Sequence, residues 1–582
     1  MAATGILPPT LPKLIFKPEP DPEALRRFKD QLNIHPAFLK ILLRLNVRHF
    51  EDARDFFRPH QDLLHDPFLM QDMGAATERI LKALRRKEYI LFWGDYDVDG
   101  TTATALMMSF FRDYLEYDRV DFYIPDRYSE GYGLSPQGLQ YASDNRFTLL
   151  ISLDCGIRAV EEIRLARSFD LDVIVCDHHL PGTELPPAHA ILNPKQPGCP
   201  YPFKELSGCG IAFKLVQALA TSQGLSVQDL LPLTDWVAIS SCADIVPLIG
   251  ENRTLVYLGL QEIKRRPRPA VQALAAACGL DLENLTSEDI VFGISPRINA
   301  AGRIEHGRLA VQMLLEENTD RISSLVQKLE NLNEERRAYD RQMTIEAMEM
   351  VASGVPTQFS IVAFRDTWHK GVVGIVAARL VEKYHLPAVV LTQSNGIITG
   401  SARSIPGFDL YEALSSCAHL LLSFGGHAHA AGLTLLPQNL DAFIQRFDQV
   451  AAERFGFEKP TPFVIVDDEI SFQHVTTSFV KIKNQLGPFG PGNMDPVFLS
   501  RNLIVHDDEI VEFGEGHLKF KVRQPSCCPT AYPAVGFGFA PYKDFLKQGL
   551  YFDMAYNLSL YGRQDRIELE AKAILPSNSL CP

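Results

Sequence analysis

The fold is decided by Leu171-Asp172-Val173-Ile174-Val175-Cys176-Asp177-His178-His179, an apolar run that ends in an aspartate and two histidines. Two other apolar runs in the same half of the chain also end at aspartates. Residues 89–93 lead into Gly94-Asp95-Tyr96-Asp97-Val98-Asp99-Gly100, and residues 147–153 stop at Asp154. Each run is short and is followed by a helix-like stretch, which is typical of strands in a parallel βαβ sheet.

These polar strand ends predict a metal site. Ligands of open α/β sheets bind in the crevice beyond the carboxyl ends of the strands, so distant residues can meet there. The expected members are Asp95, Asp97, Asp154, Asp177, His178 and His179, with Asp244, which follows the apolar residues 236–242, as a seventh. A mixed set of this size exceeds what one zinc takes and suits two Mn²⁺ or Mg²⁺ ions. Two ions about 3.5–4 Å apart are the usual apparatus for in-line hydrolysis at phosphorus.

Each motif alone has an ordinary alternative. The aspartates at 95–99 could form a solvated turn, the Asp-His-His run could be a solvated strand end, and Asp244 could simply end a helix. A calcium loop is excluded by spacing, because the twelfth position counted from Asp95 is Leu106 and not glutamate. The ten cysteines lack the paired spacing of a zinc site, so free thiols in a reducing compartment are expected.

Composition places the chain among ordinary globular proteins, with 22% charged and 46% hydrophobic residues. The net charge of −14 argues against nucleic-acid binding by bulk attraction, although local basic patches are compatible with it. The first nine residues lack a basic segment followed by an apolar one, and no run of about 18 apolar residues follows. We therefore expect a cytoplasmic protein that does not span a membrane.

A chain of 582 residues is too long for one core. We expect an α/β multidomain protein with five segments: a helical N-terminal region at 1–85, a parallel-sheet catalytic domain at 86–315, a long connecting helix at 316–352, a smaller α/β domain at 353–457, and an all-β barrel or sandwich at 458–575.

Two further motifs suggest phosphate contacts in the smaller α/β domain. Residues 425–432 are glycine-rich, so backbone amides could approach an anion, with His427 as an added donor. Ser401-Ala402-Arg403-Ser404 is the other polar break, and arginine suits bidentate phosphate binding. The alternative for the glycine-rich run is a tight turn that packs against a helix.

Two basic groups could contact nucleic acid. Residues 517–523 alternate strictly, so a strand there would present Lys519, Lys521 and Arg523 on one face, either as a binding stripe or as a solvated outer surface. Arg297, Arg303 and Arg308 form the second group. They could hold backbone phosphates, or form interdomain salt bridges to Glu305 or Glu316.

Together these motifs resemble the DHH phosphoesterase superfamily. Asp95–Gly100 looks like its first motif, Asp154 its second, Asp177-His178-His179 its third and Ala243-Asp244 its fourth, while 401–404 and 425–432 look like the phosphate-binding part of its associated domain. The resemblance implies a DHH catalytic domain, a DHH-associated domain and a C-terminal OB-fold. It implies the catalytic set Asp95, Asp97, Asp99, Asp154, Asp177, His178, His179 and Asp244. The implied metal ligands are the same residues without Asp99 and His179, and His179 either ligates or orients the phosphate.

Four other stretches are similar to the bacterial single-strand-specific exonucleases of that superfamily, at residues 65–70, 128–135, 296–303 and 368–376. This likeness implies a 5′→3′ exonuclease that cuts mononucleotides from single-stranded DNA in repair and recombination, with two Mn²⁺ or Mg²⁺ ions. The implied substrate contacts are Arg297, Asn299, Arg303, Ser401, Arg403 and His427, with Lys519, Lys521 and Arg523. A monomer with a single-strand-binding protein and a helicase as partners is expected. The alternatives are a phosphodiesterase of oligoribonucleotides or cyclic dinucleotides, and a non-catalytic scaffold.

Overall fold

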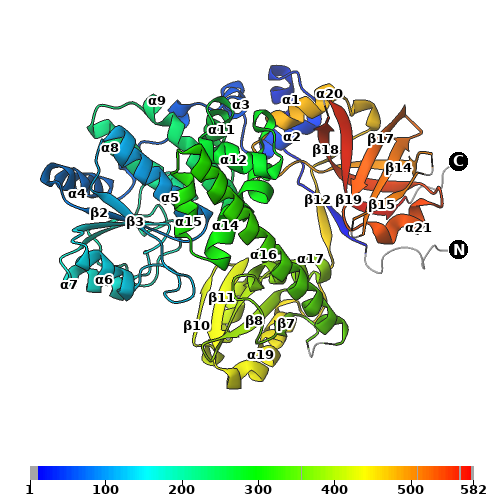
Figure 1. Ribbon diagram of the computed structural model, residues 1–582. Coiled ribbons are helices and arrows are strands. Elements are labelled where there is room, and N and C mark those ends of the chain that lie inside the picture. The colour runs from blue at the N-terminus through cyan, green and yellow to red at the C-terminus, as the bar shows by residue number, and fades with distance from the viewer. Residues whose placement is uncertain (1–10, 355–356, 508, 515, 563–564, 578–582) are drawn as a thin grey trace. The chain divides into compact units, whose positions relative to one another are not determined.

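The structure is a computed structural model that describes residues 11–354, 357–507, 509–514, 516–562 and 565–577 (Figure 1). The first nine residues, on which the expectation of no leader rests, lie outside this range. The chain divides into two compact units. The larger comprises His60–Pro460 with Gly490–Gly492, and the smaller comprises Met1–Pro59, Thr461–Phe489 and Asn493–Pro582.

The larger unit contains a five-stranded sheet in the order β3-β2-β4-β5-β6, with every neighbouring pair parallel. Its strands are β2 (Ile90–Gly94), β3 (Val120–Tyr123), β4 (Leu149–Leu153), β5 (Asp172–Cys176) and β6 (Ala190–Leu192). Gly94 is level with Leu153, which is level with Cys176. The residues that follow these three strands therefore emerge side by side at one edge, as the apolar runs predict.

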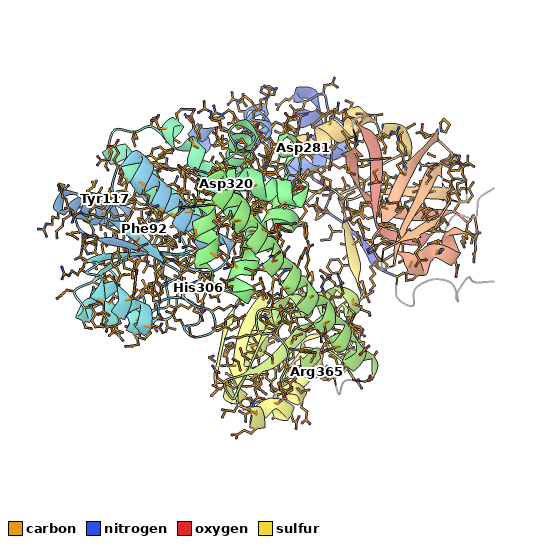
Figure 2. All side chains as sticks on the ribbon, in the orientation of Figure 1. Phe92, Tyr117, Asp281, His306, Asp320 and Arg365 are labelled. Atoms are coloured by element: carbon orange, nitrogen blue, oxygen red, sulfur yellow. The ribbon has the colours of Figure 1, made fainter. Side chains whose placement is uncertain are left out.

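Both faces of this sheet are covered, which explains why its strands are apolar throughout. Phe92 of β2, labelled in Figure 2, packs in the core that includes residues of α4 (Met73–Arg86), α5 (Val98–Ser109) and α8 (Gly208–Ser222). The alternate residues Leu91 and Trp93 pack on the other face against α6 (Pro136–Asp144) and α7 (Val160–Ser168). The helices that complete this part are α9 (Val227–Leu230), α10 (Thr234–Ala243), α11 (Gly250–Arg265), α12 (Pro269–Cys278), α13 (Ser287–Asp289), α14 (Ser295–Ile304) and α15 (Arg308–Leu314).

The expected connecting helix is α16 (Thr319–Ala352), which packs against α14 near its start and against α17 (Val373–Tyr384) near its end (Figure 1). Beyond it lies a second sheet in the order β10-β11-β9-β8-β7, in which only the β7–β8 pair is parallel. Its strands are β7 (Ile361–Phe364), β8 (Ala388–Ser394), β9 (Ile397–Arg403), β10 (Ser423–Gly426) and β11 (Ala430–Leu435), and α18 (Leu410–Ser415) and α19 (Leu440–Arg454) complete the domain.

The smaller unit is built on a mainly antiparallel sheet in the order β13-β14-β18-β19-β17-β16-β15. Its strands are β13 (Asp468–Glu469), β14 (Phe498–Val505), β15 (Val511–Phe513), β16 (His517–Gln524), β17 (Cys528–Gly536), β18 (Phe552–Tyr561) and β19 (Arg566–Pro576). An additional pairing of β14 with β16 closes five of these strands into a ring. This closed five-stranded arrangement is the expected OB-like barrel. The helices α20 (Thr477–Gln485) and α21 (Lys543–Leu546) belong to this unit.

The N-terminal region differs from the expected single helical segment. Residues up to Pro59 belong to the smaller unit, whereas those from His60 onward belong to the larger one. The first part contains β1 (Lys13–Phe16), which pairs in parallel with β12 (Phe463–Val466), besides the helices α1 (Pro22–Gln31), α2 (Pro36–Arg44) and α3 (Phe50–Phe57). The periodicity of the helices did not reveal β1, because its partner strand lies far along the chain. In the described residues no helix is long and apolar enough to span a bilayer.

Candidate metal centre and substrate site

The first acidic motif is a tight loop between β2 and α5. Asp97 is the N-cap of α5, and its Oδ1 accepts hydrogen bonds from the backbone amides of Asp99 (2.9 Å) and Gly100 (3.2 Å). A side chain at Gly100 would place Cβ 2.4 Å from the backbone nitrogen of Asp95, so only glycine permits this close approach. The loop thus turns Asp95 and Asp97 toward the edge of the sheet while a helix begins.

The second motif depends on another close approach. Asp154 follows β4 in the left-handed region, with φ at 62°, a conformation that aspartate tolerates better than most residues. Gly208, the first residue of α8, lies so close that an added Cβ would be 2.6 Å from the Cβ of Asp154. The backbone therefore holds the Asp154 carboxylate in one place beneath the loop that carries His178.

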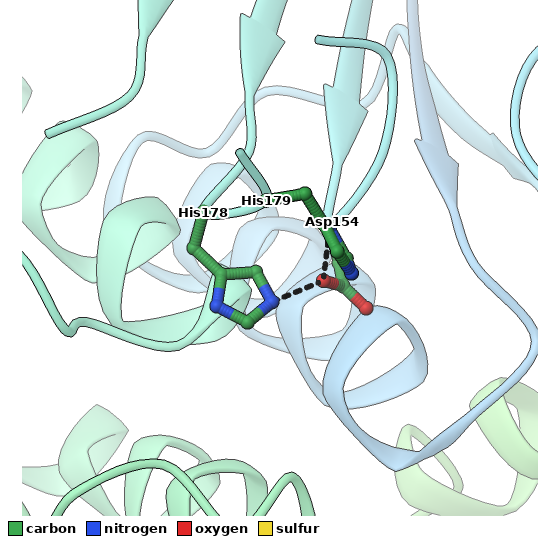
Figure 3. A group of neighbouring side chains, drawn as sticks. All are labelled: Asp154, His178 and His179. Atoms are coloured by element: carbon green, nitrogen blue, oxygen red, sulfur yellow. Dashed lines mark ion pairs between the residues drawn. The ribbon is translucent and has the colours of Figure 1, made fainter. Parts of the chain in front are cut away.

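Three overlapping groups of side chains have the spacing of metal ligands. Within each group the donor atoms lie within 4.8 Å of one another. The groups are Asp95 with Asp97 and Asp154; Asp99 with His178 and Asp244; and Asp154 with His178 and His179. Figure 3 shows the last group, in which His178 Nε2 lies 3.1 Å from Asp154 Oδ1 and His179 Nδ1 lies 3.9 Å from the same oxygen. Asp244 Oδ2 lies 3.6 Å from His178 Nε2.

Several donor atoms at the centre of these groups are buried without hydrogen bonds. Among the described residues, Asp95 Oδ1, Asp154 Oδ1 and both ring nitrogens of His178 have no hydrogen-bond partner. Buried polar atoms are normally satisfied, and leaving one unpaired costs about 1–3 kcal/mol. Carboxylate oxygens and an imidazole are suitable donors for Mn²⁺ and Mg²⁺. The residues present therefore fit divalent cations.

The electrostatics of the cluster favour the same conclusion. Burial raises the pKa of Asp95 well above its ordinary range, and the charge of Asp97 raises it further. Burial likewise raises the pKa of Asp154 and of Asp244, with Asp99 and Asp97 adding to both shifts. Closely packed carboxylates repel one another, which raises their pKa values, whereas bound divalent cations attract them and favour their charged form.

Asp99 differs from the rest of the first motif, because its carboxylate already accepts three hydrogen bonds from the protein. It accepts hydrogen bonds from the backbone amides of Gly208 (2.6 Å) and Cys209 (2.7 Å) at the start of α8, and from Ser240 Oγ (2.6 Å). Burial and the charge of Asp97 raise the pKa of Asp99 to about 6, although these three hydrogen bonds oppose the shift. Asp99 therefore joins α5 to α8 and α10 beneath the candidate ligands.

Asp177 also differs from the predicted ligand set. Its carboxylate accepts hydrogen bonds from the backbone amides of Ile157 (2.9 Å) and His179 (3.0 Å), and it lies 2.7 Å from His179 Nδ1. Asp177 is in none of the three ligand groups. The geometry shows that it orients His179, and its role as a metal ligand stays a prediction.

The two histidines of the motif have opposite protonation preferences. Burial lowers the pKa of His178 well below its ordinary value, and the neighbouring His179 lowers it further, so the ring is neutral and can ligate a metal. Burial also acts to lower the pKa of His179, but Asp177, with Asp244 and Asp95, raises it to about 9. Asp177 therefore favours the protonated form of His179.

The predicted phosphate-binding motifs of the smaller α/β domain are adjacent in the sheet. Ser401 of β9 is level with Gly432 of β11, and Arg403 is level with Ala430. Arg403 Nη1 donates to Ser401 Oγ (2.7 Å) and to the carbonyl of Ala402 (2.8 Å). The glycine-rich run is thus a β-hairpin, and the start of α18 contacts it, because the backbone amide of Leu410 donates to the carbonyl of Ala428 (3.0 Å).

A cluster of arginines lies next to the carboxylates. Burial lowers the pKa of Arg303 to about 10, and the charges of Arg127, Arg336 and Arg403 contribute, while Asp97 opposes them. Like charges gathered in this way repel one another and favour a bound anion. Arg127, whose guanidinium lies 4.9 Å from the ring centre of Tyr96, was missed by the sequence prediction. Arg127 directly precedes residues 128–135, but no residue pattern there marks it as a binding residue.

Two other predicted substrate residues have contacts within the protein. Arg297 forms an ion pair with Glu330 of α16 and donates to the carbonyl of Gly293 (2.9 Å). This supports the salt-bridge alternative, although the partner is Glu330 and not Glu305 or Glu316. Asn299 Oδ1 accepts from the backbone amide of Val98 (3.2 Å) and so steadies the first acidic loop. Their roles as substrate contacts stay predictions that these bonds do not favour.

His427 is the residue of the hairpin that reaches the metal cluster. Its ring stacks on that of His179, with centroids 5.8 Å apart and planes 13° apart. Tyr132, which the sequence prediction also missed, contacts two residues of the cluster. Its hydroxyl donates to the carbonyl of Asp154 (2.8 Å) and lies 3.3 Å from His179 Nδ1. The two α/β domains of the larger unit therefore share one site.

The predicted basic stripe lies on β16 of the barrel. Lys519 and Lys521 are exposed and Arg523 is half-buried, whereas Leu518, Phe520 and Val522 are buried in the core. Lys519 Nζ lies 4.9 Å from the ring centre of Phe513, and Lys521 pairs with Glu509 at 3.5 Å. The alternation is as expected, and binding of DNA by the stripe stays a prediction.

Comparison with known proteins matches three domain families in the predicted order. Residues 89–239 match the N-terminal domain of the DHH family, residues 357–453 match the DHHA1 domain, and residues 466–573 match the RecJ OB domain. The single-stranded-DNA-specific exonuclease RecJ of Escherichia coli is 34% identical over 519 residues, which cover 85% of this chain and 89% of the relative. The chain belongs to the RecJ family.

Other RecJ proteins extend the comparison. RecJ of Bacillus subtilis is 38% identical over 91% of this chain, and the chain spans 66% of that relative's length. The crystal structure of RecJ from Thermus thermophilus in complex with Mn²⁺ has a TM-score of 0.81 and 27% identity, and the match covers 98% of this chain and 80% of that one. A second RecJ structure from the same organism contains Mg²⁺.

Proposed function

We propose that this protein is a metal-dependent exonuclease that hydrolyses single-stranded DNA from its 5′ end, in DNA repair and recombination. The observation that carries the proposal is the set of buried atoms without hydrogen bonds on Asp95, Asp154 and His178, which lie in ligand groups with further carboxylates. Membership of the RecJ family and the Mn²⁺ and Mg²⁺ complexes of RecJ structures support it.

Asp95, Asp97, Asp154, His178 and Asp244 would hold two Mn²⁺ or Mg²⁺ ions, with Asp99 beneath them. Bound there, the ions supply charge neutralisation at the scissile phosphate and a water that loses its proton near neutral pH. The chain itself fixes the geometry: α5 begins at Asp97, and α8 and α10 hold Asp99. Asp177 holds the His179 ring, whose free nitrogen would donate to a phosphate oxygen. This assigns His179 to the phosphate and His178 to the metal.

Arg403, Arg303 and Arg127 would bind the 5′-terminal phosphate. Arg403 is fixed by Ser401, and Arg303 donates to the carbonyl of Gly371 (3.1 Å), so both guanidinium groups are already positioned. Gly374, near the start of α17, leaves room for the Arg403 guanidinium group, because an added Cβ would lie 3.0 Å from Arg403 Nη2. A 5′-terminal phosphate held beside the metal ligands would place the first phosphodiester at the site, and on this ground we propose 5′→3′ polarity.

The remaining expectations belong to the same proposal. We expect a cytoplasmic monomer that binds single-stranded DNA through the residues of the metal centre and the stripe of Lys519, Lys521 and Arg523, and that works with a single-strand-binding protein and a helicase. The scaffold alternative is disfavoured, because all members of the predicted ligand set except Asp177 gather in the ligand groups.

The test is degradation of single strands labelled at either end, with Mn²⁺, Mg²⁺ or chelator. Release of labelled mononucleotide first from the 5′ end, and only with metal, is expected. Arg403→Gln should raise KM about 10-fold for 5′-phosphorylated strands and change it little for 5′-hydroxyl strands, since a charged hydrogen bond contributes about 1.5–3 kcal/mol. Release from the 3′ end would overturn the polarity, and faster turnover of a dinucleotide than of a long strand would favour the small-substrate alternative.

A further inference from the structure

A second group of cations lies on the histidine side of the metal cluster. Arg158 follows β4, and its Nε donates to the carbonyl of Leu180, the residue after His179 (2.8 Å). Lys195 follows β6, and its backbone amide donates to the side chain of Asn193 (2.7 Å). Asn193 in turn donates to the carbonyl of His179 (2.8 Å). The Arg158 side chain and the backbone of Lys195 are therefore linked by hydrogen bonds to the segment that carries the DHH motif.

This group is separate from the arginines that surround Arg303. The pKa of His427 is lowered by burial, then by His179, Lys195 and Arg158, whereas the cations that act on Arg303 are Arg127, Arg336 and Arg403. Lys195 also acts on Asp244 and His178. One group of positive charges thus acts on Arg303 together with Asp97, and the other acts on His427, with Lys195 also acting on Asp244.

The charged groups of Arg158 and Lys195 have few or weak partners within the protein. Arg158 is exposed, and among the described residues its terminal guanidinium nitrogens make no hydrogen bond or ion pair. Lys195 Nζ pairs with Glu205 at 3.1 Å, but the Glu205 side chain is 42% exposed, so this pair contributes little, about 0–1 kcal/mol. A phosphate could take its place at small cost.

We propose that Arg158 and Lys195 form a second phosphate-binding subsite, which holds the phosphate on the 3′ side of the scissile bond. The proposal rests on the proposed exonuclease function. A strand whose 5′ phosphate lies on Arg303 and Arg403 presents its first phosphodiester to the metal ligands and its next phosphate to Arg158 and Lys195. One phosphate-binding group on each side would hold the reacting phosphate at the metal ligands. Such positioning of the reacting atoms contributes to catalysis.

The test uses the full chain and 5′-phosphorylated oligonucleotides of increasing length. A dinucleotide has no phosphate beyond the scissile bond, and a trinucleotide has one. In the wild type, kcat/KM should rise about 10-fold from dinucleotide to trinucleotide, as for one charged hydrogen bond. In Lys195→Gln and Arg158→Gln this rise should be smaller, and in the double variant it should be absent.

Salt dependence provides an independent readout. For long strands, the slope of log kcat/KM against log salt concentration should become shallower by about 0.7 for each lost cation, the value for one phosphate contact on a single strand. Lys204→Gln is the matched control, because Lys204 is in the same loop but donates to the carbonyl of Cys199 (2.7 Å). It should keep the wild-type length and salt dependence.

Each other outcome decides against the subsite. If the double variant keeps the rise with length and the salt slope of the wild type, no phosphate binds there. If it loses dinucleotide and trinucleotide turnover in equal proportion, the residues act on the metal centre. Failure of the proposed function itself looks different, because the wild type would then release no mononucleotide from any strand in Mn²⁺.

Discussion

The ring of His427 stacks on the ring of His179, with centroids 5.8 Å apart and planes 13° apart. One histidine follows β5 of the catalytic sheet and the other lies in the β10–β11 hairpin of the second sheet. Because His179 is also held by Asp177, its ring is fixed from two sides. The stacking therefore couples the second sheet to the orientation of a residue at the metal site.

Replacing His427 should slow hydrolysis. We expect His427→Ala to lower kcat/KM on single-stranded DNA about 10-fold, equivalent to about 1.4 kcal/mol, because the His179 ring loses the ring that stacks on it. His429→Ala is the control, since His429 is in the same hairpin but contacts the protein through its backbone carbonyl, which accepts from Ser404. Equal effects of the two substitutions would show that stacking on His179 is unimportant.

Asp97 combines two roles that substitution can separate. Asp97→Ala removes both the candidate ligand and the N-cap of α5, so activity should be lost and stability should fall by about 1 kcal/mol. Asp97→Asn keeps a good cap and should lose activity with nearly unchanged stability. Steady-state hydrolysis and urea unfolding in chelator measure the two effects. Retention of most activity by either variant would remove Asp97 from the site.

The same change of charge should have opposite effects on stability at two neighbouring aspartates. Asp99→Asn places an amide against backbone N–H donors of α8 and should destabilise the protein by about 1–3 kcal/mol. Asp154→Asn removes a charge that four nearby aspartates repel, and its Oδ1 makes no hydrogen bond, so stability in chelator should rise. Unfolding midpoints in chelator provide the comparison, and a shift of the same sign in both would contradict the assignment.

Added metal should stabilise the wild type. Mn²⁺ at about 100 times its dissociation constant should contribute about 2.7 kcal/mol of stability and raise Tm. In Asp154→Asn and in His178→Ala this rise should be strongly reduced, because each change removes a donor shared by the ligand groups. Arg297→Gln alters a charge away from these donors and should respond to Mn²⁺ like the wild type. An unaltered rise in Asp154→Asn would place the cations elsewhere.

The smaller unit should lose stability at acid pH through His35. Its Nδ1 accepts from the backbone amide of Ala37 at the start of α2 (3.2 Å), and its ring lies 4.8 Å from that of His474. Burial lowers the pKa of His35 below its ordinary 6.5, and His474 lowers it further. The unfolded chain therefore binds the proton first, so the stability contributed by neutral His35 is complete above pH 6.5 and declines as pH falls below it.

His35→Asn tests this prediction, because asparagine is a good N-cap and does not titrate. Thermal unfolding of wild type and variant between about pH 7.5 and pH 5 should show a steeper loss of Tm in the wild type. Parallel curves would mean that His35 does not contribute.

The sequence determined the elements around the candidate site in detail. Three apolar runs ending in aspartates predict three neighbouring parallel strands, and β2, β4 and β5 are adjacent and level. This prediction succeeds because parallel strands buried on both faces must be apolar throughout, and their polar ends must gather at one edge. The alternation of apolar and basic residues at 517–523 likewise predicts strand β16, because a barrel strand has one buried face.

What the tertiary structure alone decided is which polar group each side chain meets. Asp97 and Asp99 are two residues apart in one motif, yet the carboxylate of Asp99 accepts hydrogen bonds from the start of α8 and from Ser240. Asp177 holds His179, Arg297 binds Glu330, and Arg127 joins an arginine cluster that no spacing revealed. Local sequence fixes burial and periodicity, which depend on each element's own faces. Partners are brought together only by long-range packing, because hydrogen bonds and ion pairs depend on distances of a few ångströms between elements far apart in the chain.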